Sequence, residues 1–488
     1  MEKRWIFLTE SYEGLEKTAI NHLYGVLAGH LPYVLPIRSA EEITQEECED
    51  AHIILVGKIG GNRLLKECQN RNLIQPPEAR EGYSVYVGES IFNADAQMIV
   101  IAGQDVAGVL YGCMDFCNKY LGDVIFRDKN LWADKTYEEA LNQKLNPRQI
   151  TSAPAIKRRA VWTWGHVIYD YRRFFENMAK LRLNEVVIWN DVVPWNAKDV
   201  VDYAHSLNIK VIWGFAWGWD TSCKNVLDRY NSQFIAEIKE QVLKTYEKEY
   251  SPTGADGIYF QTFTEHSITE IDGKPIARIV TELVNDVAAS LFEKYPDLQI
   301  QFGLHATSVR EKLEHIQKVD KRIHIVWEDC GCFPFDYYAD CVDAFDETLA
   351  FTEETLTLRG KDEKWGAVLK GMLKLDWHKF EHFTAPYILG ERTADYLKQR
   401  QLKKDRIWKL QQAGWLKNAD YARRIIAVVA AQGNEDTVVQ ALVEDALLEN
   451  RIAFPVALYA EMLWSPYGDA DEMIAQVAKV PCVHFSNY

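Results

Sequence analysis

Apolar and polar positions follow a repeating pattern through the middle of the chain. Short apolar runs bounded by polar or turn residues predict buried strands, whereas apolar residues three and four apart predict amphipathic helices. Strands are predicted at 158–164, 185–191, 209–217, 257–263, 298–304, 322–329 and 365–373. Helices are predicted among them at 171–183, 197–207, 231–250 and 277–295. This alternation is typical of a parallel α/β domain and favours a (β/α)₈ barrel. The position of the eighth strand is not predicted by the pattern.

The sequence before and after this pattern predicts two further parts of the fold, one at each end of the chain. Strands at 52–57, 83–88 and 98–103 and a helix at 106–121 predict a small α/β domain over residues 1–150. The stretch from about 130 to 153, with Pro147 and Pro154 near its end, is predicted as a linker. We assign residues 151–395 to the barrel and residues 396–488 to a helical region. The expected fold class is therefore α/β: a small α/β N-terminal domain, a (β/α)₈ TIM barrel and a helical C-terminal region.

Size and charge narrow the class of protein. A chain of 488 residues is too long for one ordinary core, which indicates two or three domains. The formal net charge of −16, with no compensating basic run, argues against nucleic acid or an anionic membrane as a partner. The sequence contains no apolar run of about 18 residues, and Glu10 and Glu13 interrupt the start of the chain where a secretion signal would stay apolar. We expect a cytoplasmic protein.

Two short motifs could hold a metal. The nine cysteines are scattered, and the Cys330-Gly-Cys332 pair has no second pair at zinc-site spacing, so we interpret them as reduced structural thiols. The pattern H-x-x-E-H at 378–382 is a zinc motif that requires both histidines on one helical face. Pro386 follows closely and would end such a helix early. We expect no metal and no cofactor.

The chemistry of the barrel is expected where its strands end, because active sites of such barrels lie at that face. Carboxylates, imidazoles and indoles follow the predicted strands, a composition typical of a cleft for an oligosaccharide. Indole rings stack well on flat sugar faces, although most aromatic residues serve core packing. The residues expected to bind substrate are Trp164, His166, Asn190, Asp191, Trp217, His266, His305, Trp327, Lys370 and Trp377.

Two carboxyl groups are the candidates for catalysis. Cleavage of a glycosidic bond needs one neutral carboxyl group to protonate the leaving oxygen and one ionised carboxylate to act as nucleophile or base. Glu265, just beyond the strand at 257–263, is the candidate acid, and Glu328 or Asp329 is the candidate second carboxylate, with Asp191 as a rival. The structural alternative is that a Thr-Glu pair at a strand end caps a helix.

Four stretches of the chain resemble glycoside hydrolase family 67, the α-glucuronidases, and relatives that join a small family 20b-like domain to a (β/α)₈ barrel. They are AQMIVIAGQDVAGVLYG near 96–112, YRRFFENMAKLRLNEVVIWND at 171–191, GIYFQTFTE around the candidate acid and FPVALYAEMLWSPYGDADEMIAQV near the C-terminus. The resemblance implies an exo-acting glycoside hydrolase that trims oligosaccharides, with Glu265 as general acid and Glu328 as a carboxylate that activates water. It also implies a homodimer formed through the C-terminal helices.

The chain departs from that family at the fifth strand, where the family carries its other base carboxylate. The stretch GLHATS offers His305 and Thr307 instead. For a uronate substrate, the plausible cations are Arg158, Arg159 and Lys370. Specificity for glucuronic acid therefore does not follow from the resemblance, and the chain looks like a divergent relative.

Two alternatives stay open. One is a β-N-acetylhexosaminidase-like enzyme, because families 20 and 84 share the small domain. Those families use two adjacent carboxylates after the fourth strand, whereas Thr264-Glu265-His266 contains one. The other alternative is a carbohydrate-binding barrel without catalysis, which the missing carboxylate after the fifth strand favours.

Overall fold

The computed structural model separates into two compact units, one made mainly of residues 1–154 and the other mainly of residues 155–479. The structure describes residues 3–77, 79–125, 140–164, 168–189, 192–218, 232–265, 268–328, 333–372, 385–443 and 446–486.

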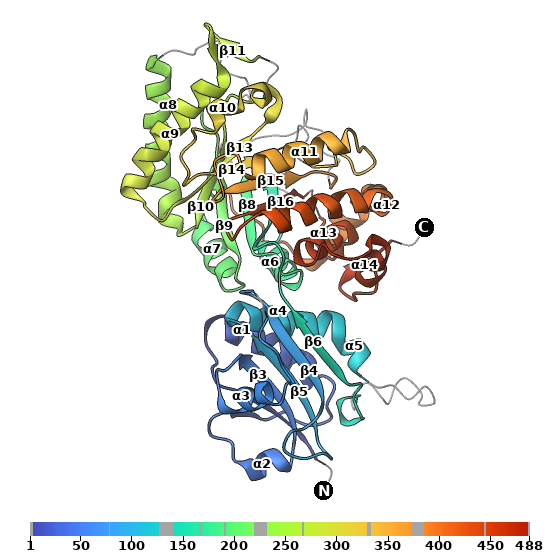
Figure 1. The fold of residues 1–488 in the computed structure, drawn as a ribbon. Coiled ribbons are helices and arrows are strands. Elements are labelled where there is room, and N and C mark those ends of the chain that lie inside the picture. Colours follow the sequence, from blue (N-terminus) through green and yellow to red (C-terminus); the bar gives the residue numbers. More distant parts are fainter. Residues whose placement is uncertain are drawn as a thin grey trace. The chain divides into compact units, whose positions relative to one another are not determined.

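The first unit is a six-stranded sheet with helices packed on it (Figure 1). The strand order is β2-β1-β3-β5-β4-β6, with β4 antiparallel to both of its neighbours and the other pairs parallel. The strands are β1 (Trp5–Thr9), β2 (Ile37–Ser39), β3 (His52–Lys58), β4 (Tyr83–Glu89), β5 (Gln97–Gly103) and β6 (Arg148–Ser152). The helices are α1 (Gly14–Ala28), α2 (Gln45–Glu49), α3 (Arg63–Asn70), α4 (Val106–Asp115) and α5 (Leu121–Val124).

One strand of this unit was not predicted from the sequence, and one sequence interpretation needs correction. The apolar start of the chain is strand β1, which pairs with β2 and β3 and is almost wholly buried. The stretch predicted as a linker contains strand β6, which pairs with β4 at the edge of the sheet. Its residues alternate between intermediate and exposed positions, so the strand lacks the apolar run by which β3 and β5 were predicted.

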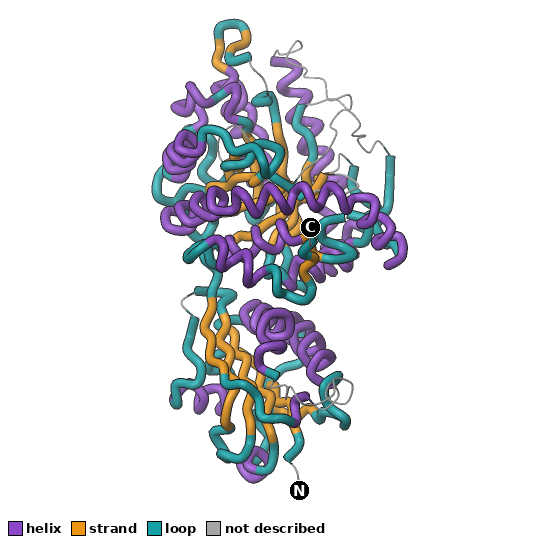
Figure 2. The backbone as a smooth tube through the Cα atoms, turned by 90° about the vertical axis from the view of Figure 1, so that its right-hand side faces the viewer, coloured by secondary structure: helices purple, strands orange, loops and turns teal. Residues whose placement is uncertain are grey.

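The second unit is a closed barrel of eight parallel strands in the order β10-β13-β14-β15-β16-β7-β8-β9. Helices surround the strands on the outside (Figure 2). The barrel strands are β7 (Arg158–Trp164), β8 (Glu185–Trp189), β9 (Lys210–Gly214), β10 (Gly257–Gln261), β13 (Gln299–Leu304), β14 (His324–Trp327), β15 (Trp365–Leu369) and β16 (Val438–Leu442). The helices are α6 (Tyr171–Lys180), α7 (Ala197–His205), α8 (Ser232–Thr245), α9 (Ile276–Lys294), α10 (Leu313–Ile316), α11 (Phe345–Leu356), α12 (Ala394–Gln432), α13 (Phe454–Trp464) and α14 (Ala470–Val477). Two small two-stranded sheets pair β11 (Glu270–Ile271) with β12 (Lys274–Pro275) and β17 (Ile452–Ala453) with β18 (Val483–His484).

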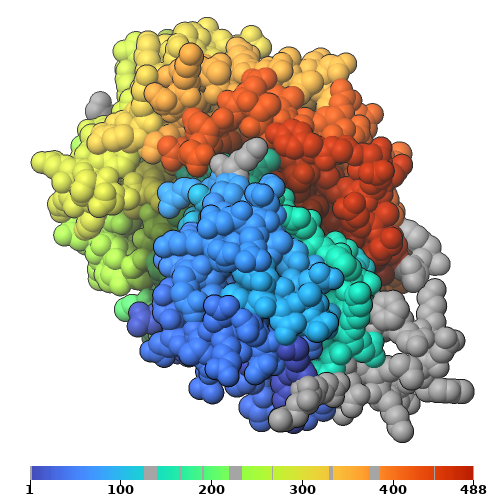
Figure 3. Space-filling model, turned by 60° about the horizontal axis from the view of Figure 1, so that its bottom comes forward, coloured from blue at the N-terminus to red at the C-terminus, as the bar shows by residue number. Residues whose placement is uncertain are grey.

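The predicted TIM barrel is confirmed, and its eighth strand is β16. This strand follows the 39-residue helix α12 and pairs with β15 on one side and with β7 on the other. The barrel therefore extends beyond residue 395, where the sequence analysis ended it. Residues 438–442 fall in the region predicted to be helical, because a short apolar run that is buried on both faces has the same pattern in a strand and in a helix. Helices α12 to α14 contribute a continuous part of the surface of this unit, coloured orange to red in Figure 3.

The interior of the barrel holds a layer of large side chains. It is made by alternate residues of the strands, because successive side chains of a strand point to opposite faces. Trp162, Trp189 and Tyr259 meet there, with ring centroids 5.7 to 6.1 Å apart. Ala160, Val187, Ile212, Val326, Val368, Val438 and Leu442 complete the cluster. This layer fills the barrel beneath the carboxyl ends of the strands.

Candidate active site

Strand β10 ends in a sharp change of backbone direction that places Glu265. Phe263 has a φ of 44°, a left-handed conformation that bulky residues rarely adopt and that costs about 1–3 kcal/mol. Its side chain is buried, and a Cβ at Gly218 would lie 3.0 Å from its ring, so close packing holds it in place. Thr264 is buried next to it, and the Glu265 side chain emerges with 46% of its surface exposed.

Glu328 lies directly after β14 and is almost fully buried. The Tyr259 hydroxyl and the Gln261 side-chain amide both donate to its Oε1 atom. Tyr259 and Gln261 are two residues apart on β10, so both point to the interior of the barrel. A carboxylate that accepts several hydrogen bonds is favoured in its ionised form.

His305, directly after β13, connects the two candidate carboxylates. Its Nε2 atom lies 3.0 Å from Oε2 of Glu328 and 3.9 Å from Oε1 of Glu265. These two carboxylate oxygens are therefore no farther apart than the sum of the two distances. Paired carboxyl groups in glycosidases lie about 5–9.5 Å apart, so the pair is close enough for such chemistry.

Hydrogen bonds between the ends of β10 and β13 fix this arrangement. The backbone N–H of His305 donates to the Thr264 hydroxyl over 3.3 Å, and the Ser308 hydroxyl donates to the Thr264 carbonyl over 2.8 Å. All three residues are buried. Thr264 thus holds His305 close to Glu265, which directly follows Thr264 in the chain.

The environment of Glu328 lowers the pKa of its carboxyl group. Burial by itself raises this pKa, but the charges of His305 and Lys370 and the hydrogen bonds from His305 and Tyr259 outweigh it. Glu328 is therefore ionised at neutral pH. It suits the role of the ionised carboxylate and not that of the acid.

Only glycine fits at position 303 of β13. A Cβ there would overlap the Tyr259 hydroxyl and the Oε1 atom of Glu328. The absence of a side chain at Gly303 therefore leaves room for the hydrogen bond between Tyr259 and Glu328.

Lys370 follows β15 and is 3% exposed. Its Nζ atom lies 6.0 Å from the ring centroid of Trp162 and 5.2 Å from that of Tyr337. Within the described part of the chain, these two ring contacts and the charge of Glu328 are its electrostatic partners, and no carboxylate lies within ion-pair distance. Cation–π contacts are worth about 0.5–2 kcal/mol each, less than the several kcal/mol that desolvation of an ammonium costs.

The two other cations considered for a uronate lie away from these residues. Arg158 begins β7, at the end of the barrel opposite the site, and forms an ion pair with Glu185 at 2.7 Å. Arg159 is fully buried and donates to the carbonyl oxygens of Ile156 and Arg182. Neither arginine reaches the carboxyl ends of the strands, because both stand at the first residues of their strand.

Two of the predicted indoles are part of the barrel wall. Trp217 is fully buried and stacks on Phe260 with ring centroids 3.5 Å apart. Trp327 is 1% exposed and packs against Phe351 of α11. Phe260 and Trp327 are the strand residues next to the inward-facing Tyr259 and Glu328, so they point outward, and these two indoles do not face the site.

The other predicted site residues are not described. The side chain of Trp164 lies outside the described part, although its backbone ends β7. The residues wholly outside the described ranges are Asp329, His166, Asn190, Asp191, His266 and Trp377. Two motifs considered for metal, Cys330-Gly-Cys332 and H-x-x-E-H at 378–382, also lie outside them.

Within the described ranges, no group of three or more His, Cys, Asp or Glu side chains is placed to hold a metal ion. No helix found there combines the length and apolar character that a membrane crossing requires.

Tyr259 and Gln261, which donate hydrogen bonds to Glu328, were not predicted as site residues. The signal was present in GIYFQ, where alternation places the polar Tyr259 and Gln261 on one face of an otherwise apolar strand. The site residues were predicted from the ends of the strands, and the inward-facing residues earlier on each strand were not included.

The comparisons with known proteins concern the fold. No protein-family model matches the sequence, and a search of curated proteins gives no match. Solved structures do match. The chain shares the fold of glycoside hydrolases of families 20 and 84. Its TM-score is 0.53 to the structure titled CpGH84B, at 11% identity over 98% of this chain and 70% of that one.

Two further structures give similar alignments. For the family 20 β-N-acetylhexosaminidase from Streptomyces coelicolor A3(2), the TM-score is 0.50 at 11% identity, over 100% of this chain and 95% of the other. The structure titled CpGH84D has 14% identity and a TM-score of 0.42, and the alignment covers 89% of this chain and 66% of that one. The two alignments with TM-scores of 0.53 and 0.50 support the two-part fold of a small α/β unit and a barrel. The structures matched above are not of family 67.

Proposed function

We propose that the protein is an exo-acting glycoside hydrolase in which Glu265 is the general acid and Glu328 is the ionised carboxylate. The observation that carries the proposal is His305, whose Nε2 atom contacts both carboxylates at the carboxyl ends of the barrel strands. The fold shared with families 20 and 84 supports the same reaction class, since both are glycoside hydrolases.

The proposed reaction begins with the proton of the Glu265 carboxyl group. This proton passes to the glycosidic oxygen as the bond from the anomeric carbon to that oxygen breaks, and the leaving unit departs as an alcohol. Positive charge develops on the sugar ring, and the negative charge of Glu328 stabilises it. In one route Glu328 bonds to the anomeric carbon, and water that gives a proton to the Glu265 carboxylate then breaks this bond. In the other route Glu328 takes a proton from the water that attacks the anomeric carbon. Asp329 is the other candidate for this second role.

His305 is proposed to position Glu328. Its 3.0 Å contact and the hydrogen bonds from Tyr259 and Gln261 hold the carboxylate in one orientation. Bound sugar would cover the exposed side chain of Glu265. Removal of water from that carboxyl group favours its neutral form, which is the form an acid catalyst needs.

Two sugars are proposed for the terminal position. An N-acetylhexosaminide is one, since the structures of similar fold include a family 20 β-N-acetylhexosaminidase. A glucuronide is the other, since Lys370 is a buried cation without a carboxylate at ion-pair distance in the described part, and a uronate would supply one. Both belong in the first substrate panel.

A leaving-group series tests the role of Glu265. Aryl N-acetylhexosaminides and glucuronides with good and poor leaving groups are assayed on the wild type and on Glu265→Gln. We expect kcat/KM to fall by about 10²–10⁴ for poor leaving groups and much less for dinitrophenyl glycosides, which leave without a proton.

The matched control is Glu270→Gln, an exposed glutamate five residues further along the chain, which should behave as the wild type. An equal loss for all leaving groups would exclude Glu265 as the acid. Absence of hydrolysis of every substrate, together with measurable binding of sugar, would favour the carbohydrate-binding barrel.

A further inference from the structure

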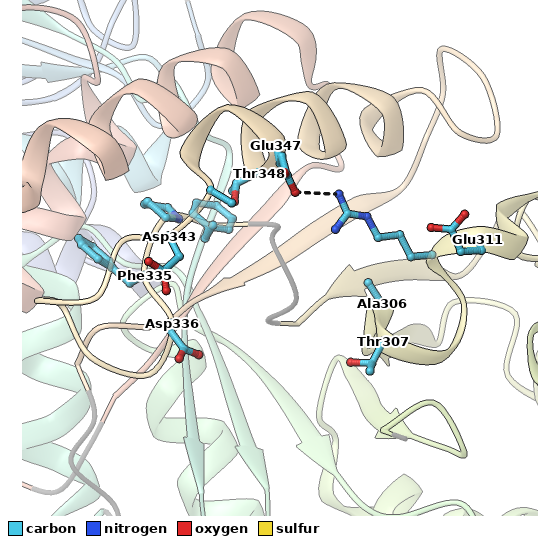
Figure 4. A pocket seen from close by; sticks show the side chains of 12 residues that line it. Ala306, Thr307, Glu311, Phe335, Asp336, Asp343, Glu347 and Thr348 are labelled. Atoms are coloured by element: carbon cyan, nitrogen blue, oxygen red, sulfur yellow. Dashed lines mark ion pairs between the residues drawn. The ribbon is translucent and has the colours of Figure 1, made fainter. Parts of the chain in front are cut away.

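A cavity of about 480 Å³ opens between the segments that follow β13 and β14. Pockets that bind small molecules have volumes of about 300–1,000 Å³, so it can hold a sugar-sized group. Asp336 and Asp343 stand on one side of it and Ala306 and Thr307 on the other (Figure 4). Glu265, Glu328 and His305 are not among the residues that line it.

The cavity adjoins the proposed catalytic residues along the chain. Ala306, which lines it, directly follows His305. Ser308, two residues further, donates to the carbonyl oxygen of Thr264, the residue before Glu265. The wall of the cavity is therefore hydrogen-bonded to the segment that carries the proposed acid. A general acid stands beside the oxygen of the leaving unit, so a cavity next to the segment of the proposed acid is a candidate place for that unit.

The charge of the cavity is strongly negative. Among the described residues that line it, Arg310 is the one cation, against four carboxylates, Glu311, Asp336, Asp343 and Glu347. Arg310 is also partly engaged, because it lies 3.9 Å from Glu347 (Figure 4). Its guanidinium also lies over the Phe351 ring. The two aspartates across the cavity have no ion pair of their own within the described part.

Apolar surface accompanies these carboxylates. Phe333 and Phe335 line the same cavity and are buried behind it. Carboxylates beside aromatic rings form a site for an ammonium group carried on a ring-sized unit. An anionic unit would meet repulsion there.

We propose that this cavity is the subsite for the leaving unit and that Asp336 and Asp343 select a unit that carries an ammonium group, such as a hexosamine with a free amine. The inference rests on the proposed function. It assigns the negatively charged cavity to the leaving unit, whereas Lys370 is proposed to contact the terminal sugar.

A matched pair of substrates tests the proposal. They are 4-aminomethylphenyl and 4-hydroxymethylphenyl glycosides of the same terminal sugar, which are similar in size and differ in charge at neutral pH. The ratio of their kcat/KM values, charged over neutral, is measured for the wild type and for the double variant Asp336→Asn/Asp343→Asn. Intrinsic differences between the leaving groups cancel when the two ratios are compared.

We expect the ratio to be about five- to tenfold higher in the wild type than in the double variant, because charge-assisted hydrogen bonds are the stronger ones. Added salt should reduce the ratio in the wild type, since it screens charges in open sites. Asp340→Asn changes an exposed aspartate on the same segment that does not line the cavity, and it should keep the wild-type ratio. Equal ratios in the wild type and the double variant would overturn the proposal.

Failure of the proposed function gives a different result. In that case neither aryl glycoside is hydrolysed by any form of the protein. Calorimetric titration with a glucosamine trisaccharide and with its N-acetylated counterpart then tests the cavity without turnover. Preference for the free amine, lost in the double variant, would retain the cation-selective cavity, and equal affinity for the two sugars would overturn it.

Discussion

At the scale of single residues, the proposed chemistry depends on two glutamates in different surroundings. Glu265 is half exposed at a strand end, whereas Glu328 is buried beneath it and surrounded by donors. In the proposed reaction, these different surroundings suit the same residue type to two roles, as general acid–base pairs require. His305 contacts both groups and is the residue that makes them a pair.

The lowered pKa of Glu328 predicts how stability depends on pH. Its ordinary value is 4.5, and the folded-state value is lower. A carboxyl group with a depressed folded-state pKa contributes stability that is fully present above its unfolded-state pKa and is lost as pH falls through the folded-state pKa. We expect the free energy of unfolding of the wild type, relative to Glu328→Gln, to be constant near neutral pH and to decrease once the pH falls below about 4.5.

Urea unfolding between pH 7 and pH 3 measures this difference. The exposed Glu270→Gln variant serves as the reference for changes unrelated to a buried carboxylate. A difference between wild type and Glu328→Gln that grows as the solution becomes more acidic would contradict the lowered pKa.

At the scale of elements, the site depends on how the ends of β10 and β13 are joined. Neither strand alone places Glu265 beside His305. The unusual backbone of Phe263 turns the chain, and the Thr264 hydroxyl accepts the backbone N–H of His305. The strain at Phe263 is stabilised by its packing in the loop.

Two threonines in this turn give a matched test. Thr264→Val removes a hydroxyl that accepts a buried N–H, and it should lower the free energy of unfolding by about 1–3 kcal/mol and reduce kcat. Thr262→Val is the control, because the Thr262 hydroxyl is buried and has no hydrogen-bond partner within the described residues.

Urea unfolding and the aryl glycoside assay are carried out on both variants. Thr262→Val should be neutral or slightly stabilising, since it removes an unpaired polar group. If the two variants lose the same stability and activity, the hydrogen bond from His305 is not what positions the site.

At the scale of the whole molecule, the barrel is closed by a strand that comes after a long helical excursion. β16 lies between β15 and β7 and pairs with both. Without it, the unpaired backbone groups of two neighbouring strands would be left at an open edge, which favours aggregation. The helical C-terminal region is therefore not separable from the barrel at residue 395.

Truncation of the chain after residue 395 tests this dependence. We expect the truncated protein to be largely insoluble, or to exchange the backbone amides of β7 and β15 rapidly in hydrogen-exchange mass spectrometry. Strands β3 and β5 of the first unit, which pair with each other and not with the deleted segment, are the internal reference and should stay protected. A soluble truncated protein with protected β7 and β15 amides would show that closure by β16 is dispensable.

The sequence by itself determined the barrel, because seven of its strands carry apolar runs and amphipathic helices are predicted between the first five of them. Both are local patterns, which neighbouring residues decide. The sequence also determined that Glu265 stands at the end of a strand. The tertiary structure alone decided three features. β16 needed long-range pairing, since its five buried residues have no periodicity that tells strand from helix. The shared contact of His305 with Glu265 and Glu328 joins three strand ends far apart in sequence. Burial turned Trp217 and Trp327 from candidate sugar platforms into wall residues, because solvent exposure is a property of packing and not of residue type.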